Sequence, residues 1–230
     1  MSDIIRLTQN FYQQCQKATN MKNPQELIEA NHVGWGSIKT QKEGFKVATD
    51  LPWIDWKEVD SVLDIGCGYG GLLEFLTTTK LYQGKYQGID IMPNHIIQAV
   101  LNYSNKQNSC FQTRDFMEQD WDALQFDVVI SLGGICVNHD YPLRHGQKSL
   151  EYAQRFIIKA VHFSRSALSL YFPKADKKTK KDYRLMAYYE IAEIEAMIRE
   201  SCGSRLEDLI FVSYPEQTDL KTIAKVKLSS

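Results

Sequence analysis

The sequence lacks several features that would place it in common classes of protein. Its five cysteines are far apart and odd in number, and none forms a Cys-x-x-Cys pair, so neither a zinc site nor a disulfide framework is indicated. The formal net charge of −1 offers no positive excess for nucleic acid or an anionic membrane. No signal-peptide pattern opens the chain, and no apolar run is long enough to span a bilayer. We expect a cytoplasmic protein without nucleic-acid or membrane partners.

The composition is that of an ordinary globular protein. The 230 residues are 43% hydrophobic and 24% charged, which is sufficient for one α/β domain with a substantial core. No internal repeat or low-complexity linker divides the chain. Cys110 and Cys136 stand in or beside apolar runs, and we expect both to be small core side chains.

Hydrophobic periodicity predicts a helical preface followed by alternating strands and helices. Helices are predicted over residues 3–19, from near Pro24, and over 38–49, then over 70–79, 94–104, 147–163 and 188–201. Strands are predicted over 61–65, 85–90, 109–113, 126–131, 166–172, 207–213 and 221–228. This order predicts an α/β fold with a doubly wound, mostly parallel, seven-stranded Rossmann-like sheet whose last strand is antiparallel. We divide the single domain into an N-terminal helical extension (1–56) and a core (57–230).

The most informative segment is Val62-Leu63-Asp64-Ile65-Gly66-Cys67-Gly68-Tyr69-Gly70-Gly71. An apolar strand ends in an acidic residue, and a glycine-dense turn leads directly into a helix. Glycine allows the chain to reverse tightly and a ligand to touch bare backbone. The arrangement is typical of a nucleotide-like cofactor site.

Two cofactor classes fit this segment. Gly66-x-Gly68-x-x-Gly71, with Asp90 nineteen residues further on, satisfies the dinucleotide fingerprint and permits an NAD-dependent oxidoreductase. However, the carboxylate of Asp64 would repel a pyrophosphate and suits a cationic amino acid moiety. Asp115 and Phe116, after the third strand, can accept from an adenine amino group and pack against its ring.

With these residues in order, the core (about 35–228) resembles the class I S-adenosylmethionine-dependent methyltransferases. Asp64 to Gly70 are similar to the first motif of that family. Asp90 occupies the position of its ribose-binding acid, and Asp115 and Phe116 occupy the positions of its adenine-contacting residues. The resemblance implies S-adenosyl-L-methionine as cofactor and S-adenosyl-L-homocysteine as product. It implies a cofactor site made of Asp64, Gly66, Cys67, Gly68, Asp90, Ile91, Asp115, Phe116, Ser131 and Leu132.

A narrower resemblance points to small-molecule methyltransferases of unassigned substrate. It rests on Trp35-Gly36-Ser37 with Gln41 and Phe45, and on Tyr188-Tyr189 before Glu190 and Tyr214-Pro215. Residues 131–141 lack the Asn/Asp-Pro-Pro-aromatic tetrapeptide of methyltransferases that act on adenine or glutamine nitrogen. We therefore expect methyl transfer to an oxygen or nitrogen of a small molecule, with Trp35, Gln41, Gly133 and Tyr188 at the acceptor.

Catalytic groups are less well marked. His139 is the candidate general base, with His145 behind it, because imidazole titrates near neutrality. Asn138, His139 and Asp140 are an alternative cation site, but their spacing matches no known ligand pattern, and we expect no metal. A non-catalytic protein that retains the cofactor fold is a further alternative, and the sequence does not indicate an oligomeric state.

Overall fold

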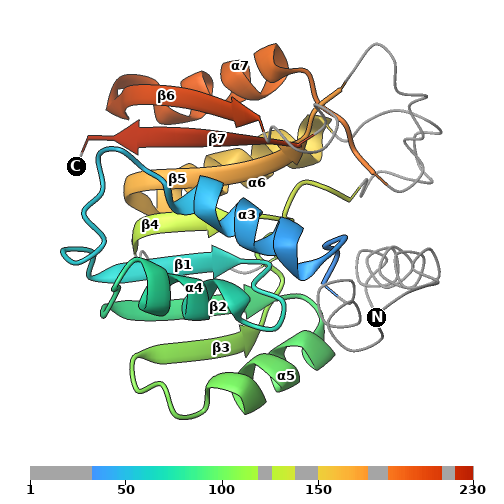
Figure 1. Cartoon of the computed structure of the whole chain (residues 1–230). Helices are drawn as coiled ribbons and strands as arrows, with labels where there is room; N and C mark the ends of the chain where they lie inside the picture. The colour runs from blue at the N-terminus through green and yellow to red at the C-terminus, as the bar shows by residue number, and fades with distance from the viewer. Residues whose placement is uncertain (1–32, 119–125, 138–149, 176–185, 214–220, 230) are drawn as a thin grey trace.

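Seven strands form one mixed sheet at the centre of the protein. The computed structural model describes residues 33–118, 126–137, 150–175, 186–213 and 221–229. The strands are β1 (Ser61–Ile65), β2 (Lys85–Asp90), β3 (Ser109–Thr113), β4 (Phe126–Ser131), β5 (Ser164–Pro173), β6 (Leu206–Ser213) and β7 (Lys221–Leu228). Their spatial order is β3-β2-β1-β4-β5-β7-β6, and only β7 runs antiparallel to its neighbours (Figure 1). The predicted sheet and its antiparallel last strand are confirmed.

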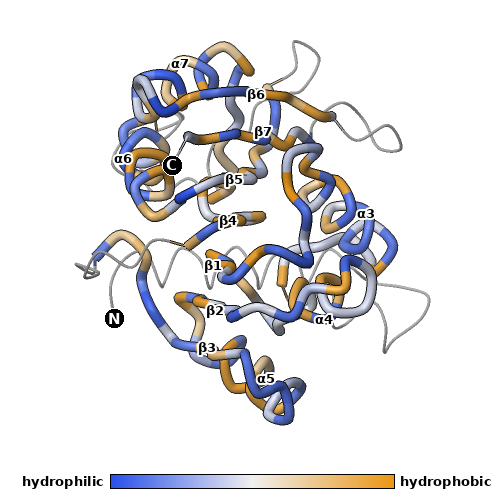
Figure 2. Tube along the Cα trace, turned by 90° about the vertical axis from the view of Figure 1, so that its left-hand side faces the viewer, coloured by the Kyte–Doolittle hydropathy of each residue, from blue (hydrophilic) through white to orange (hydrophobic). Residues whose placement is uncertain are grey.

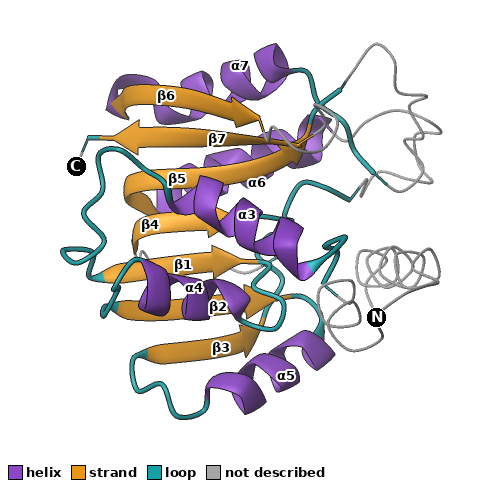
Figure 3. Cartoon of the chain, viewed as in Figure 1, coloured by secondary structure: helices purple, strands orange, loops and turns teal. Residues whose placement is uncertain are grey.

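Helices cover both faces of this sheet. They are α3 (Ile38–Thr49), α4 (Gly71–Thr79), α5 (Pro93–Tyr103), α6 (Leu150–Phe163) and α7 (Ile191–Cys202), followed by a short 3₁₀ turn (Gly203–Arg205). Figures 2 and 3 show α3 and α4 on one side of the sheet and α6 and α7 on the other. No helix within the described ranges is long and apolar enough to cross a bilayer.

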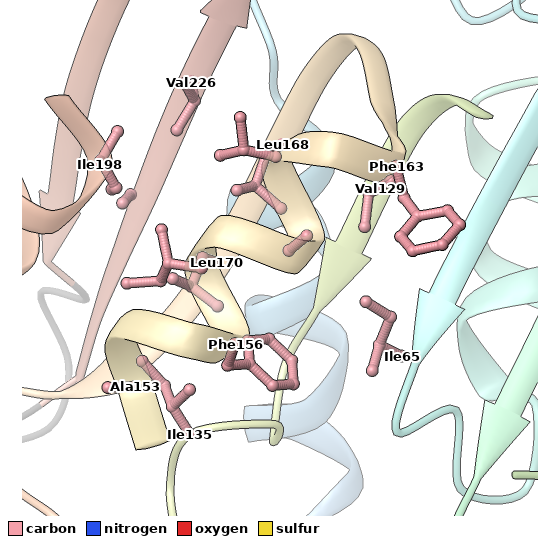
Figure 4. Close-up of a cluster of buried hydrophobic side chains, with 14 of the residues drawn as sticks. Ile65, Val129, Ile135, Ala153, Phe156, Phe163, Leu168, Leu170, Ile198 and Val226 are labelled. Carbon is pink, nitrogen blue, oxygen red and sulfur yellow. The ribbon is translucent and has the colours of Figure 1, made fainter. Parts of the chain in front are cut away.

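Each face has its own hydrophobic core, because side chains alternate along a buried strand. In β1, Val62 packs with the α3 and α4 side, whereas Leu63 packs with the α6 and α7 side. Figure 4 shows the second core, in which Phe156 of α6 packs near Ile65 and Ile135. Because α3 shares a core with α4 and β1, its residues belong to the same folded body as the sheet.

Two expectations about local structure are wrong. The last major helix begins at Ile191 rather than near Tyr188, because Glu190 and Glu193 form a reciprocal capping box there. Tyr189 instead extends the sheet region, and its amide donates to the Pro173 carbonyl (2.9 Å). Cys110 is exposed, since β3 is an edge strand, whereas Cys136 is buried as expected. The helices predicted over 3–19 and near Pro24 lie outside the described residues.

The loop after β4 is held against α6 by a glycine. A Cβ atom on Gly134 would lie 2.2 Å from Cζ of Phe156, which is itself almost fully buried, and 2.7 Å from Oγ of Ser131. A Cβ atom on Gly133 would meet nothing within 4 Å. The two adjacent glycines therefore have different roles: Gly134 allows close packing, and Gly133 leaves open space.

This difference gives a matched pair of substitutions. Gly134→Ala should lower the free energy of unfolding by about 1–3 kcal/mol, because the added methyl group overpacks the core beside Phe156. Gly133→Ala should change it by less than about 0.5 kcal/mol. Chemical denaturation of both variants measures the difference, and equal stabilities would contradict the packing described for this loop.

Candidate active site

The carboxyl ends of β1, β2 and β4 meet at one edge of the sheet. The pairing places Ile65 beside both Ile89 and Ser131, and Asp90 beside Thr113 at the end of β3. The strand order reverses at β1, which is the topological switch point where open α/β sheets bind ligands.

A cavity lies at this edge, with about 930 Å³ of empty space that includes the open solvent at its mouth. Its lining includes nine of the ten predicted cofactor residues: Asp64, Gly66, Cys67, Gly68, Asp90, Ile91, Asp115, Phe116 and Leu132. The predicted acceptor residues Trp35, Gln41 and Gly133 line the same cavity.

The loop after β1 is built on three left-handed glycines. Gly66, Gly68 and Gly70 have φ values of +81°, +55° and +81°, which side chains with a Cβ rarely adopt. Gly71 does not share this conformation, and a Cβ there would make a tight contact at 3.3 Å with the Phe45 ring of α3. The backbone thus uses the acid-x-Gly-x-Gly-x-Gly spacing and not the Gly66-x-Gly68-x-x-Gly71 spacing.

The amides of this loop are already bonded within the protein. Those of Gly66 and Cys67 both donate to the Ile89 carbonyl (2.8 and 2.9 Å), and that of Gly70 donates to the Cys67 carbonyl (3.0 Å). The Gly68 amide donates to Oδ2 of Asp90 (2.9 Å). A pyrophosphate site needs such amides directed at the ligand, so these four are not available for one.

Asp90 holds two loops together at the floor of the cavity. Its Oδ2 accepts from Gly68 as described, and its Oδ1 accepts from the amide of Met92 (2.8 Å). Nδ1 of His95, in the first turn of α5, lies 3.2 Å from Oδ2. The carboxylate lines the cavity while its position is fixed from both sides.

Asp64 is a buried acid with an aromatic partner. The hydroxyl of Tyr86, a fully buried residue of β2, donates a short hydrogen bond to Oδ2 of Asp64. Burial raises the pKa of Asp64 from its ordinary 3.8 to about 7, and Asp90 adds repulsion, while the Tyr86 hydrogen bond opposes the rise. A ligand that brings a positive charge to Asp64 would relieve this penalty.

Asp115 and Phe116 form one wall of the cavity. Oδ1 of Asp115 accepts from the amide of Met117 (2.8 Å), whereas Oδ2 is buried and accepts no hydrogen bond within the described part of the chain. A buried acceptor without a donor costs free energy, so a ligand donor is expected there. The Phe116 ring packs at 5.0 Å from that of Phe156, which fixes the apolar surface beside Asp115.

Ser131 does not line the cavity, unlike the other predicted cofactor residues. It is fully buried, its hydroxyl donates to the Ile65 carbonyl (3.1 Å), and the same oxygen accepts from the amide of Gly134 (3.2 Å). It therefore supports the loops after β1 and β4 from behind. Cys67 does line the cavity, and burial raises the pKa of its thiol well above the usual value, so the thiol stays neutral.

The predicted acceptor residues fall into two groups. Trp35 packs edge-on against Phe45 (5.9 Å between ring centroids) and lines both the main cavity and a second one beside it. Tyr188 lines neither cavity, because it lies in the extended segment before α7. The candidate bases His139 and His145, and the alternative cation ligands Asn138 and Asp140, lie outside the described residues.

Several lining residues are absent from the sequence-based set. Val33, Phe45, Tyr152 and Phe156 line the main cavity, and Tyr171, Met186 and Lys221 line the second one. Tyr152 and Phe156 are spaced by four on α6, a pattern that indicates a buried face but not a cavity. In the described ranges no three His, Cys, Asp or Glu side chains are grouped to hold a metal ion.

A three-glycine loop and acids at three successive strand ends define a Rossmann-like fold with a cavity suited to a nucleoside cofactor. Residues 62–157, from β1 into α6, match the protein family described as a methyltransferase domain. This part of the chain is therefore similar to methyltransferase domains.

Individual relatives are distant or cover only part of the chain. Rv1506c of Mycobacterium tuberculosis, named as a methyltransferase, is 37% identical over 51 residues, 22% of this chain. The 2-phytyl-1,4-beta-naphthoquinone methyltransferase of Arabidopsis thaliana is 32% identical over 77 residues, 34% of this chain. Each match spans only 30% of the length of that relative.

A solved structure has the same fold as the described part of the chain. Magnesium protoporphyrin IX methyltransferase of Synechocystis PCC 6803, with bound S-adenosylhomocysteine, superposes with a TM-score of 0.61 at 14% identity. The match covers 99% of this chain and 95% of that one. At this identity the likeness shows the fold alone.

The raised pKa of Asp64 predicts a pH-dependent stability. The folded protein binds this proton more tightly than the unfolded chain, so stability without ligand falls as pH rises from about 4 to about 7. Asp64→Asn keeps an oxygen for the Tyr86 hydroxyl but cannot ionise. The melting temperature of the variant relative to wild type should therefore be higher at about pH 8 than at about pH 5.

Differential scanning calorimetry of the ligand-free protein measures this effect. Asp60→Asn is the control, since Asp60 is an exposed acid just before β1 at the opposite edge of the sheet. If the melting temperatures of Asp64→Asn and wild type differ by the same amount at both pH values, the raised pKa of Asp64 would be contradicted.

Proposed function

We propose that this protein transfers a methyl group from S-adenosylmethionine to an oxygen or nitrogen of a small-molecule acceptor. The observation that carries the proposal is the convergence of Asp64, Asp90 and Asp115 on one cavity, with Oδ2 of Asp115 buried and accepting no bond from the described residues. The methyltransferase-domain match over residues 62–157 supports it independently.

Each acid suits a different part of the cofactor. Asp64, whose ionisation is penalised by burial, would pair with the ammonium of the methionine moiety. Asp90 would accept from the ribose hydroxyls, and Asp115 would accept from the adenine amino group beside the Phe116 ring. Gly66, Cys67, Gly68, Ile91 and Leu132 would form the remaining walls.

When bound, this cofactor supplies an electrophilic methyl group on a positively charged sulfur. The residues of the chain would then act mainly by positioning, which supplies up to about 7–11 kcal/mol of a barrier in favourable cases. Trp35, Gln41 and Gly133 line the space in which an acceptor would be oriented. An acceptor that loses a proton requires a base, and we retain His139 and His145 for that role.

Three further predictions from the sequence are kept as part of this proposal. The division at residue 56, the cytoplasmic location and the small-molecule acceptor are predictions from the sequence. The two named relatives with stated substrates act on a naphthoquinone and on magnesium protoporphyrin IX, and such different acceptors show that the fold does not select one chemistry.

The alternative functions differ in what the cavity would bind. An NAD-dependent oxidoreductase needs loop amides for the pyrophosphate, and four amides of this loop are bonded within the protein. Binding of NADH in competition with S-adenosylhomocysteine would favour that alternative. A non-catalytic protein would bind S-adenosylmethionine but never convert it to S-adenosylhomocysteine with any acceptor.

The role of Asp90 is tested by calorimetric titration with S-adenosylhomocysteine. Asp90→Asn should weaken binding by at least about tenfold, because a charged acceptor for the ribose hydroxyls is lost. Asp60→Asn, outside the cavity, should bind like wild type. Unchanged affinity in a folded Asp90→Asn variant would exclude the proposed contact.

The role of Asp115 is tested by base selectivity. Wild type should prefer S-adenosylhomocysteine to S-inosylhomocysteine by at least about tenfold, since the inosine base presents an oxygen where adenine presents an amino group. Asp115→Asn offers an amide donor and should reverse this preference. Selectivity that does not change in the variant would place the base elsewhere in the cavity.

A further inference from the structure

A second cavity adjoins the first beside the loop after β4. It has about 510 Å³ of empty space, part of it open to solvent. It shares five lining residues with the main cavity, among them Trp35 and Gly133, and adds others that include Tyr171, Met186 and Lys221. A compound in this space would therefore lie next to a cofactor bound in the first cavity.

Two aromatic rings and a thioether form part of the wall of the second cavity. The rings of Trp35 and Tyr171 lie 6.4 Å apart with an interplanar angle of 37°, and Met186 adds a polarisable thioether. A bridge between Val137 and Met186, with the Ala187 amide donating to the Cys136 carbonyl (2.9 Å), fixes this wall. Such surfaces suit a planar, aromatic ligand.

Lys221 is the one charged residue among those that line the second cavity in the described ranges. It begins β7, opposite Pro173 at the end of β5, and its Nζ lies 5.8 Å from the centroid of the Trp35 ring. Partial burial lowers the pKa of this ammonium group, while the carboxylate of Glu43 opposes the change. Within the described residues it forms no hydrogen bond or ion pair beyond this ring contact.

The other lysines of β7 have partners. Nζ of Lys225 donates a short bond to the Asp50 carbonyl, and Nζ of Lys227 lies 2.7 Å from Oε2 of Glu207. In the described part of the chain no carboxylate forms an ion pair with the Lys221 ammonium, and Glu43 acts on it only at longer range, so an anion that enters the cavity would stabilise this partly desolvated charge. Among the described residues that line the second cavity, Lys221 therefore supplies the one charged contact.

We propose that the second cavity is the acceptor site and that the acceptor is a planar aromatic acid whose carboxylate pairs with Lys221. The aromatic body would lie against the rings of Trp35 and Tyr171, and its far end would reach Gly133 at the boundary with the main cavity. The proposal rests on the proposed methyl transfer, because that function makes the second cavity an acceptor site.

The test is calorimetric titration of the full chain, saturated with S-adenosylhomocysteine, with 2-naphthoate and its neutral counterpart 2-naphthylmethanol. Lys221→Met should weaken binding of 2-naphthoate by at least about tenfold and leave binding of 2-naphthylmethanol unchanged. Lys221→Arg should retain most of the affinity for the anion. Lys227→Met is the matched control, since it removes a charge from the same strand outside the cavity.

Four results would overturn the acceptor assignment: no binding of 2-naphthoate by wild type at millimolar concentration, no effect of Lys221→Met, an equal loss of 2-naphthoate affinity in Lys221→Met and Lys227→Met, or competition between 2-naphthoate and S-adenosylhomocysteine. The Lys221→Met variant must bind S-adenosylhomocysteine as wild type does, which also shows that it is folded. If wild type fails to bind S-adenosylhomocysteine, the proposed function itself fails. If that binding is intact and Lys221→Met has no effect, only the acceptor assignment fails.

Discussion

The carboxylate of Asp90 is the contact on which the geometry of the site depends. It is buried, and its two oxygens accept from the amides of Gly68, after β1, and Met92, after β2. One side chain thereby fixes the left-handed glycine loop relative to the neighbouring strand. Because the loop can follow this path only with glycine at Gly66, Gly68 and Gly70, the carboxylate and the glycine pattern depend on each other.

Concentrating acids at one edge of the sheet costs stability and prepares a site for a cationic ligand. Asp64 pays this cost most clearly, since burial and the nearby Asp90 raise its pKa to about 7, and only Tyr86 opposes the rise. Oδ2 of Asp115 is likewise buried at this edge, and no group in the described chain donates a hydrogen bond to it. A cofactor with an ammonium, ribose hydroxyls and an amino group satisfies all three acids, whereas a pyrophosphate adds further negative charge.

The sequence predicted the sheet well because its central strands are buried on both faces and read as nearly continuous apolar runs, as in Phe126–Ser131. It also predicted which strand ends converge, since parallel strands share a carboxyl edge. It did not predict that Tyr86 supports Asp64 from the neighbouring strand, that Ser131 faces inward, or that Lys221 joins the site from the last strand. These features depend on the direction of side chains and on contacts between segments far apart in the chain, and neither produces a recognisable local pattern in the sequence.

The most direct test of the whole account is a crystal structure of the protein with S-adenosylmethionine and a bound aromatic acid. The account predicts adenine beside Asp115 and Phe116, ribose on Asp90, and the methyl group directed past Gly133 into the cavity that contains Trp35 and Lys221. A nucleoside bound away from the three acids, or a methyl group that points away from the second cavity, would contradict it.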